Sequence, residues 1–376
     1  MGSTVLSSGV GRYESVTPPP ERLYQRFSGG KVLESRWPRL TDEASERFYP
    51  RRPTGLKVLL IHPPIREWSY PNIGPLGEEY IGSVVVMDGH ELDVLDLNAE
   101  RGGPVKTSLE AYTKIVEARV AEKLAESQPD VIGIGGIITQ YAWIKRIATL
   151  SKQVLPEVPI ILGGGIASSL PEFMAKRLSV DVVIQEEGDV TISEALHRLK
   201  LGASLEGVLG TAYRHVIQAG DWDVRNNGHR PSLAEGREGL DALPWPLRSR
   251  WPEDEVYRVN PVGHLNWQTK WLDGAPVARD QYSVSLIGSR GCPYAGRACD
   301  YCYAAYLGSA YRLRSPRAVV DEMEYLKERY GAVYLHFLDD LLLTSWRWAL
   351  EFFEELRERR KQTGFAVLWG GTCRTN

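Results

Sequence analysis

Cysteine is scarce in this chain, with four in 376 residues. An excess of basic residues is also missing, because 45 lysines and arginines stand against 48 aspartates and glutamates, for a formal net charge of -3. A protein without a basic field is a poor candidate for binding nucleic acid. We therefore expect no nucleic-acid partner.

Long apolar runs are missing as well. No uncharged apolar stretch approaches the roughly 18 residues that a membrane span needs. The first residues, MGSTVLSSGVGRYESVTPPP, have neither the charged nor the apolar region of a secretory signal. We therefore predict a cytoplasmic protein with no membrane partner, in which the four cysteines do not form a disulfide framework.

Apolar runs alternate with helical stretches from Leu56 onward. The runs are KVLLIHPP, ELDVLDLN, DVIGIGGIIT, PIILGGGIAS and VDVVIQEEG, and the clearest helices are expected at 109–127, 141–155 and 191–199. This alternation predicts a doubly wound, Rossmann-like α/β domain with a parallel sheet over residues 55–205. Ligands of such domains bind at the carboxyl ends of the strands. Residues 1–54 are expected to form an extended amino-terminal extension.

A second α/β unit is predicted over residues 281–376, where strand, helix, strand, helix and strand follow one another as at the start of either an α/β barrel or an open sheet. Its helices are expected to begin after the N-cap residues Ser315 and Ser345. The connector at 206–280 is rich in Pro and Trp, and we expect its tryptophans to pack between the domains; they are Trp245, Trp251, Trp267 and Trp271. A complete six-strand barrel needs about 200 residues, so we expect this chain to be an amino-terminal fragment of a longer protein.

Three of the four cysteines lie together in GCPYAGRACDYCYAA, residues 291–305. Cys292, Cys299 and Cys302 have the spacing C-x6-C-x2-C. Three thiolates suit an iron-sulfur cluster in which one iron stays open for a ligand that is not protein. Structural zinc remains an alternative: it needs four ligands, and the fold could bring His336 or Cys373 to the loop as the fourth.

These residues resemble the radical S-adenosylmethionine enzymes. A strand ends in SRGCPY, an aromatic residue directly precedes the last cysteine, and βαβ units follow. The upstream motifs GIGGIITQ, LGGGIAS and QEEGDVTISEAL are similar to the cobalamin-binding domain that precedes the radical module in one large branch of this superfamily. The resemblance covers about residues 56–376. One departure is the first cysteine spacing, which is usually three residues in the family and is six here; Gly296 lets the longer loop turn back.

The resemblance implies how a 4Fe-4S cluster and S-adenosylmethionine would be held. Cys292, Cys299 and Cys302 would bind the cluster, and the open iron would chelate the amino and carboxylate groups of the methionine moiety. Tyr301 would lie against the adenine. Asp339 and Asp340, which follow a barrel strand, would face the methionine ammonium, although two aspartates are equally suited to begin a turn.

Cobalamin would lie at the carboxyl ends of the upstream strands, where glycines allow close approach of the backbone. The contacts implied there are Gly135, Gly136, Thr139, Gly163, Gly164, Gly165, Glu187 and Gly188. No GxGxxG follows the first strand, which argues against a dinucleotide. The surroundings of His62, IHPPIREW, do not match the D-x-H-x-x-G motif of histidine-ligated domains. We therefore expect no protein histidine on the cobalt, and a His62 that faces a helix or packs in a loop.

The function implied is that of a cobalamin-dependent radical S-adenosylmethionine enzyme that methylates an unactivated carbon of a small-molecule substrate, through a 5'-deoxyadenosyl radical and methylcobalamin. Oxidative cyclisation or rearrangement is the alternative within the family. A non-catalytic metal- or corrin-binding module is the alternative from another class. An electron donor such as flavodoxin or ferredoxin is the expected protein partner. Arg290, Arg297 and Arg374 lie near the expected mouth of the site and could bind an anionic group, but the sequence assigns no catalytic side chain.

Overall fold

A computed structural model of the chain describes residues 55–373, except 70, 72, 102–103, 219–220, 235, 237–238, 252–255, 258–269, 273–274, 278–282, 295–298, 300–301 and 303–309. The expected extension at 1–54 therefore lies outside the described residues, as do Trp267, Tyr301, Arg297 and Arg374. No helix in the described part of the chain is long and apolar enough to cross a membrane.

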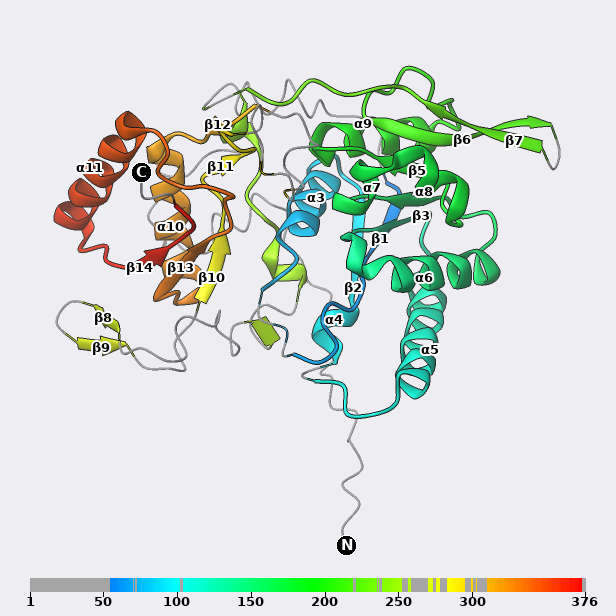
Figure 1. The fold of residues 1–376 in the computed structure, drawn as a ribbon, viewed down its shortest axis with the longest axis horizontal. Coiled ribbons are helices and arrows are strands. Elements are labelled where there is room, and N and C mark those ends of the chain that lie inside the picture. The colour runs from blue at the N-terminus through cyan, green and yellow to red at the C-terminus, as the bar shows by residue number, and fades with distance from the viewer. Residues whose placement is uncertain are drawn as a thin grey trace, which may run out of the picture.

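A seven-stranded sheet, in the order β2-β1-β3-β4-β5-β6-β7, forms the first half of the described chain (Figure 1). The strands are β1 Lys57–His62, β2 Glu91–Asp96, β3 Val131–Ile134, β4 Ile160–Leu162, β5 Val182–Ile184, β6 Thr211–Gln218 and β7 Asp221–Asn226. The first five pair in parallel, as the sequence predicted. The last two add an antiparallel hairpin that extends the sheet beyond residue 205.

Helices cover both faces of this sheet (Figure 1). They are α3 Leu76–Met87, α4 Leu97–Glu100, α5 Leu109–Ser127, α6 Tyr141–Val154, α7 Gly165–Ser169, α8 Pro171–Arg177 and α9 Gly188–Lys200, with a 3-10 turn, η1, at Ile138–Gln140. Successive residues of β1 point to opposite faces. Val58 and Leu60 pack in the cluster formed with α3 and α9, whereas Leu59 and Ile61 pack with α5 and α6. The parallel strands are therefore buried on both sides, which explains their nearly continuous apolar sequences.

The connector after β7 packs against both halves of the chain. It contains the 3-10 turns η3 Leu240–Ala242 and η4 Arg248–Arg250 and the small hairpin of β8 Lys270–Leu272 and β9 Ala275–Val277. Trp245 is buried; its carbonyl accepts a 2.6 Å hydrogen bond from the Ser83 hydroxyl on α3, and its ring centroid lies 5.0 Å from that of Tyr325. Trp251 is buried in the α3 and α9 cluster. Trp245, which contacts both halves of the chain, confirms the expected packing role, whereas the side chain of Trp271 lies outside the described residues.

The second unit has the predicted alternation of strands and helices. Its elements are β10 Ser283–Leu286, β11 Ser289–Arg290, β12 Arg312–Leu313, α10 Pro316–Tyr330, β13 Tyr334–Phe337, α11 Trp346–Thr363 and β14 Leu368–Gly370. The strands β10, β13 and β14 form a parallel sheet, and β11 pairs antiparallel with β12. The Ser315 and Ser345 hydroxyls accept hydrogen bonds from backbone amides of the first helical turns, so both N-cap predictions are confirmed.

Candidate functional site

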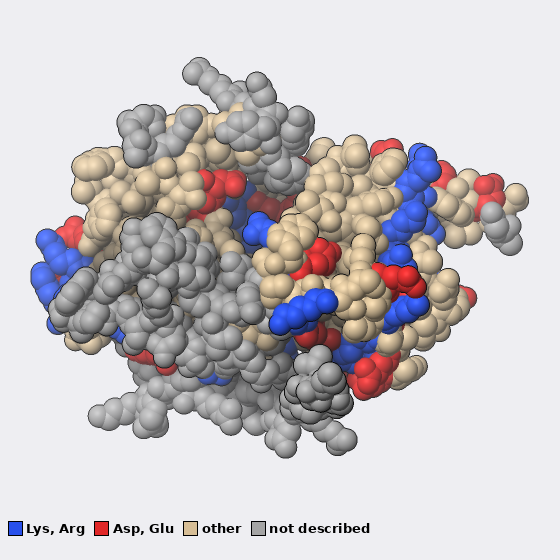
Figure 2. Space-filling view, turned by 60° about the horizontal axis from the view of Figure 1, so that its bottom comes forward, with Lys and Arg blue, Asp and Glu red and all other residues tan. Residues whose placement is uncertain are grey.

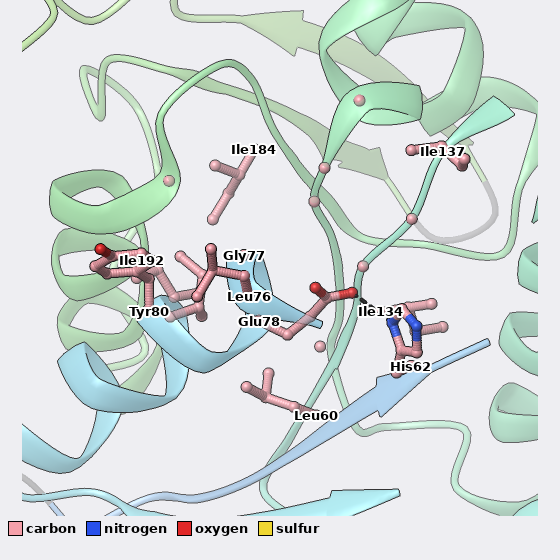
Figure 3. A pocket seen from close by; sticks show the side chains of 18 of the residues that line it. Leu60, His62, Leu76, Gly77, Glu78, Tyr80, Ile134, Ile137, Ile184 and Ile192 are labelled. Carbon is pink, nitrogen blue, oxygen red and sulfur yellow. Dashed lines mark hydrogen bonds and ion pairs between the residues drawn. The ribbon is translucent and has the colours of Figure 1, made fainter. Parts of the chain in front are cut away.

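A cavity of about 520 Å³ lies at the carboxyl ends of β1, β3, β4 and β5. Figure 3 shows its apolar wall, which includes Leu60 from β1, Ile134 from β3, Ile184 from β5 and Ile192 from α9. Ligands of doubly wound sheets bind at this edge. The cavity also reaches the second half of the chain, because Ile287, Arg290 and Leu338 line it as well.

Most of the contacts expected from the sequence line this cavity: Gly135, Gly136, Gly163, Gly164, Gly165, Glu187 and Gly188. The structural requirement for glycine differs among these positions. Gly164 has a φ of +83°, and a Cβ there would stand 2.5 Å from the Gly136 carbonyl oxygen. A Cβ on Gly135 would strike the Glu78 carboxylate, whereas a Cβ on Gly163 would meet nothing within 4 Å. Gly164 and Gly135 thus allow protein groups to pack closely, and Gly163 opens onto free space.

Thr139 does not line the cavity. It lies on η1 with its side chain exposed. The neighbouring Gln140 is buried at the cavity instead; its side-chain amide donates to the Pro63 carbonyl at 2.8 Å, and its amide oxygen accepts from the Ile137 N–H at 2.9 Å. Gln140 therefore ties the loop after β3 to the loop after β1, a role that the sequence did not indicate.

His62 and Glu78 form a pair at the wall of the cavity (Figure 3). His62 ends β1, and its Nδ1 lies 2.8 Å from Glu78 Oε1 on α3. Burial by itself lowers the pKa of His62, but the Glu78 carboxylate, with a further contribution from Asp96, more than reverses this, so the pKa is raised above the ordinary value. His62 faces a helix, as predicted. Glu78 was missed because a glutamate in the first turn of a helix ordinarily serves only the helix dipole.

Glu186 is another cavity residue that the sequence did not reveal. Its φ of +56° lies in the left-handed region, which is uncommon outside glycine. Its amide donates to the Ser168 hydroxyl at 2.7 Å, and its carboxylate lies 2.8 Å from His229 Nδ1. The strained backbone turns the chain from β5 into α9 and places Glu187 and Asp189 at the rim.

An ionic network joins this rim to the second half of the chain. Arg290 makes two hydrogen bonds to Asp189, at 2.6 and 3.2 Å, and Arg312 is paired with Glu187. Burial lowers the pKa of the Arg290 guanidinium, but Asp189 and Glu187 more than reverse this, and the pKa is raised. Arg290 was a candidate for binding an anionic ligand. The structure shows that its charge is engaged by carboxylates of the protein.

The three clustered cysteines are free thiols on the loop that begins directly after β11. Cys292 and Cys302 are half-buried and Cys299 is exposed, and the Cys302 N–H donates to the Cys299 carbonyl at 2.8 Å, which places these two in one turn. Three thiols on one segment match the expectation of a cluster held by three cysteines with one iron left open. Within the described residues, no three His, Cys, Asp or Glu side chains are arranged to hold a metal ion.

The distant residues considered as a fourth zinc ligand have other surroundings. His336 stacks on the ring of Tyr334, with centroids 6.3 Å apart, and Cys373 is exposed.

Asp339 lies at the end of β13 and is buried there. Its carboxylate accepts hydrogen bonds from the Gly288 N–H, at 2.9 Å, and from the Ser289 hydroxyl. Burial raises the pKa of Asp339 to about 6, against the opposing effect of these hydrogen bonds. Asp340 is exposed. Asp339 therefore fixes the chain just before the cysteine loop, which agrees with a structural role as well as with a site role.

Comparison with known proteins agrees with this geometry. Residues 69–196 match the B12 binding domain family. The uncharacterized methyltransferase PH0819 of Pyrococcus horikoshii is 25% identical over 327 residues, 85% of this chain and 60% of that protein. The anaerobic magnesium-protoporphyrin IX monomethyl ester cyclase of Synechocystis sp. is 22% identical over 76% of this chain and 50% of its own length. The chain thus spans 50 to 60% of the length of these two relatives.

Among solved structures, the radical S-adenosylmethionine methyltransferase TsrM of Kitasatospora setae, with cobalamin and a [4Fe-4S] cluster bound, superposes with a TM-score of 0.55 at 20% identity. The match covers 82% of this chain and 52% of TsrM. The family match thus covers β2 to β5 of the first sheet and the glycines that line its cavity. The described chain has the fold of the cobalamin-dependent radical S-adenosylmethionine enzymes, which confirms the resemblance noted in the sequence.

Proposed function

We propose that this chain is the cofactor-binding part of a cobalamin-dependent radical S-adenosylmethionine methyltransferase acting on a small molecule. The observation that carries the proposal is the position of Arg290 at both sites. Its side chain lines the cavity of the first domain, and it stands two residues before Cys292 in the chain. The cavity and the cysteine loop are therefore neighbours in space, although Arg290 and its cavity partner Asp189 are 101 positions apart in the chain. Transfer between two cofactors requires such proximity.

The residues of this chain would divide the work as follows. The cavity glycines, with Glu187 at the rim, would hold cobalamin. Cys292, Cys299 and Cys302 would bind the 4Fe-4S cluster, and Tyr301, Asp339 and Asp340 would contact S-adenosylmethionine. When bound, the cluster and S-adenosylmethionine would supply a carbon radical and cobalamin the methyl group. The apolar wall of Leu60, Ile134 and Ile184 would exclude water from the reacting groups.

The partners follow from this chemistry. A reduced flavodoxin or ferredoxin would deliver the electron, and we propose a cytoplasmic location, where such donors operate and thiols stay reduced. On the face shown in Figure 2, acidic and basic side chains are interspersed, which supports a small-molecule substrate over a nucleic acid. The similarity to a cyclase supports oxidative cyclisation as the second candidate reaction.

The test is anaerobic reconstitution with iron and sulfide, followed by metal analysis and electron paramagnetic resonance with and without S-adenosylmethionine. About four irons per chain and a spectrum that changes with S-adenosylmethionine are expected. Titration with hydroxocobalamin should show saturable binding. Zinc without an iron signal would mean a structural site and would overturn the proposal. Cofactor binding without any cleavage of S-adenosylmethionine by the full-length protein would leave only the non-catalytic module.

A further inference from the structure

The two strands that close the cysteine loop are very short. β11 and β12 contribute two residues each, with Ser289 opposite Leu313 and Arg290 opposite Arg312. A two-stranded ribbon is marginally stable at best, even with longer strands. This pair of strands, Ser289–Arg290 with Arg312–Leu313, is called the neck below, and it needs contacts with other parts of the chain to be stable. The two arginines that face each other across it increase this need, because like charges in opposite positions destabilise a ribbon.

The support comes from the first turn of α9. Glu187 lies between the two arginines, paired with Arg312 and 3.6 Å from Arg290 Nη1, while Asp189 binds Arg290 through both carboxylate oxygens. Arg312 also donates to the Leu233 carbonyl at 2.9 Å. The amino terminus of α9 favours negative charge at the same place. The carboxylates are thus stabilised by the helix and by both arginines.

Arg290 additionally forms part of the cavity wall. Its guanidinium lies over the Tyr80 ring, 5.4 Å from the centroid, and Tyr80 lines the same cavity. A ligand that fills the cavity would therefore contact the Arg290 side chain. Arg290 is separated from Cys292 by a single residue, Gly291.

We propose that Arg290 and Arg312 are positioning residues that lock the neck of the cysteine loop to the first turn of α9, and that this lock couples filling of the cavity to loading of the cysteines with iron. The coupling half of this proposal rests on the proposed function. A ligand in the cavity and iron on the cysteines would each stabilise the same arrangement of the neck. Binding at either site would therefore strengthen binding at the other by the same factor.

The lock itself is tested on the full chain without cofactors. Hydrogen exchange is measured at the amides of Ser289, Leu313 and Arg314 in the wild type, in Asp189→Asn and in Glu110→Gln. The last is a matched control that removes one carboxylate charge from an exposed pair with Lys114. We expect these amides to exchange about tenfold faster in Asp189→Asn only. Equal rates in all three proteins would overturn the lock. Arg312→Lys, which keeps the charge but loses the two-pronged geometry, serves if Asp189→Asn does not fold.

The coupling is tested by titrating hydroxocobalamin into iron-free and iron-reconstituted protein. Wild type is expected to bind roughly 5- to 150-fold more tightly when iron is loaded, and Asp189→Asn should bring this ratio close to one while both sites still fill. An unchanged ratio in Asp189→Asn, or a ratio of one in the wild type, would overturn the coupling and leave the proposed function intact. If wild type binds no hydroxocobalamin in either form, the coupling and the proposed function both fail, and hydrogen exchange still decides whether the lock exists.

Discussion

Replacing Gly163 by valine should fill part of the cavity and leave the stability of the fold almost unchanged. The residue follows β4, its φ is not in the left-handed region, and an added Cβ meets nothing within 4 Å. The free energy of unfolding should therefore change by no more than about 0.5 kcal/mol. A branched side chain projecting into the cavity competes directly with any ligand there. Overpacking of this kind costs about 1–3 kcal/mol, which predicts a Kd for hydroxocobalamin about 10- to 100-fold higher than that of the wild type.

Gly164→Ala provides the contrast one residue away. Its Cβ would lie 2.5 Å from the Gly136 carbonyl oxygen, and the alanine would have to adopt the glycine backbone conformation of φ +83° and ψ −170°, so we expect a loss of stability of about 1–3 kcal/mol from the backbone conformation alone. Isothermal titration with hydroxocobalamin and thermal unfolding monitored by circular dichroism measure both quantities. A Gly163→Val protein that binds within twofold of the wild type would show that the ligand does not occupy this cavity. A Gly163→Val protein that unfolds as easily as Gly164→Ala would refute the geometric reasoning.

Three further predictions concern titration and ligation. Because the pKa of Asp339 is raised to about 6 in the folded protein but lies near 3.9 when unfolded, the folded state binds the extra proton as pH falls from about 6 to 4. Wild type should accordingly gain about 2 kcal/mol of stability relative to Asp339→Asn over that range in urea titrations; parallel curves would contradict the assignment. The His62→Ala variant should bind hydroxocobalamin within about tenfold of the wild type, and the reduced holoproteins of wild type and variant should show the same nitrogen superhyperfine pattern on cobalt in electron paramagnetic resonance; a splitting present in the wild type and lost in the variant would make His62 a ligand. Serine at Cys292 should abolish iron loading, whereas serine at the exposed Cys373 should leave it unchanged; loss of iron in both would place Cys373 in the cluster site.

Local patterns were sufficient for most secondary structure. The buried parallel strands are continuous apolar runs, and the helices after Ser315 and Ser345 carry their start signals in the sequence. The hairpin of β6 and β7 lies in the segment expected to be a connector, and the direction in which such an edge strand pairs depends on tertiary contacts. Its register with β5 cannot be obtained from the alternation of its own side chains.

The site was predictable where one segment supplies several residues. The glycines after β3 and β4 and the three cysteines are of this kind. The pairs His62–Glu78 and Arg290–Asp189 join residues that are 16 and 101 positions apart, and a charged side chain alone in a sequence is more often solvated than paired. Thr139 illustrates the reverse case: its place after a glycine-rich strand indicated a contact, but η1 turns it to the solvent.

The neck formed by β11 and β12 has a consequence for how the cysteine spacing can vary. About twenty residues lie between Arg290 and Arg312, and the entropy of closing a loop grows only with the logarithm of its length. Three extra residues therefore raise the closure cost by roughly 0.1–0.2 kcal/mol. The six-residue spacing between Cys292 and Cys299 is then almost free thermodynamically, as long as the neck holds the loop ends. Insertions in this loop should be tolerated far better than any change at its base, which makes loop length an accessible variable for redesigning what approaches the proposed cluster.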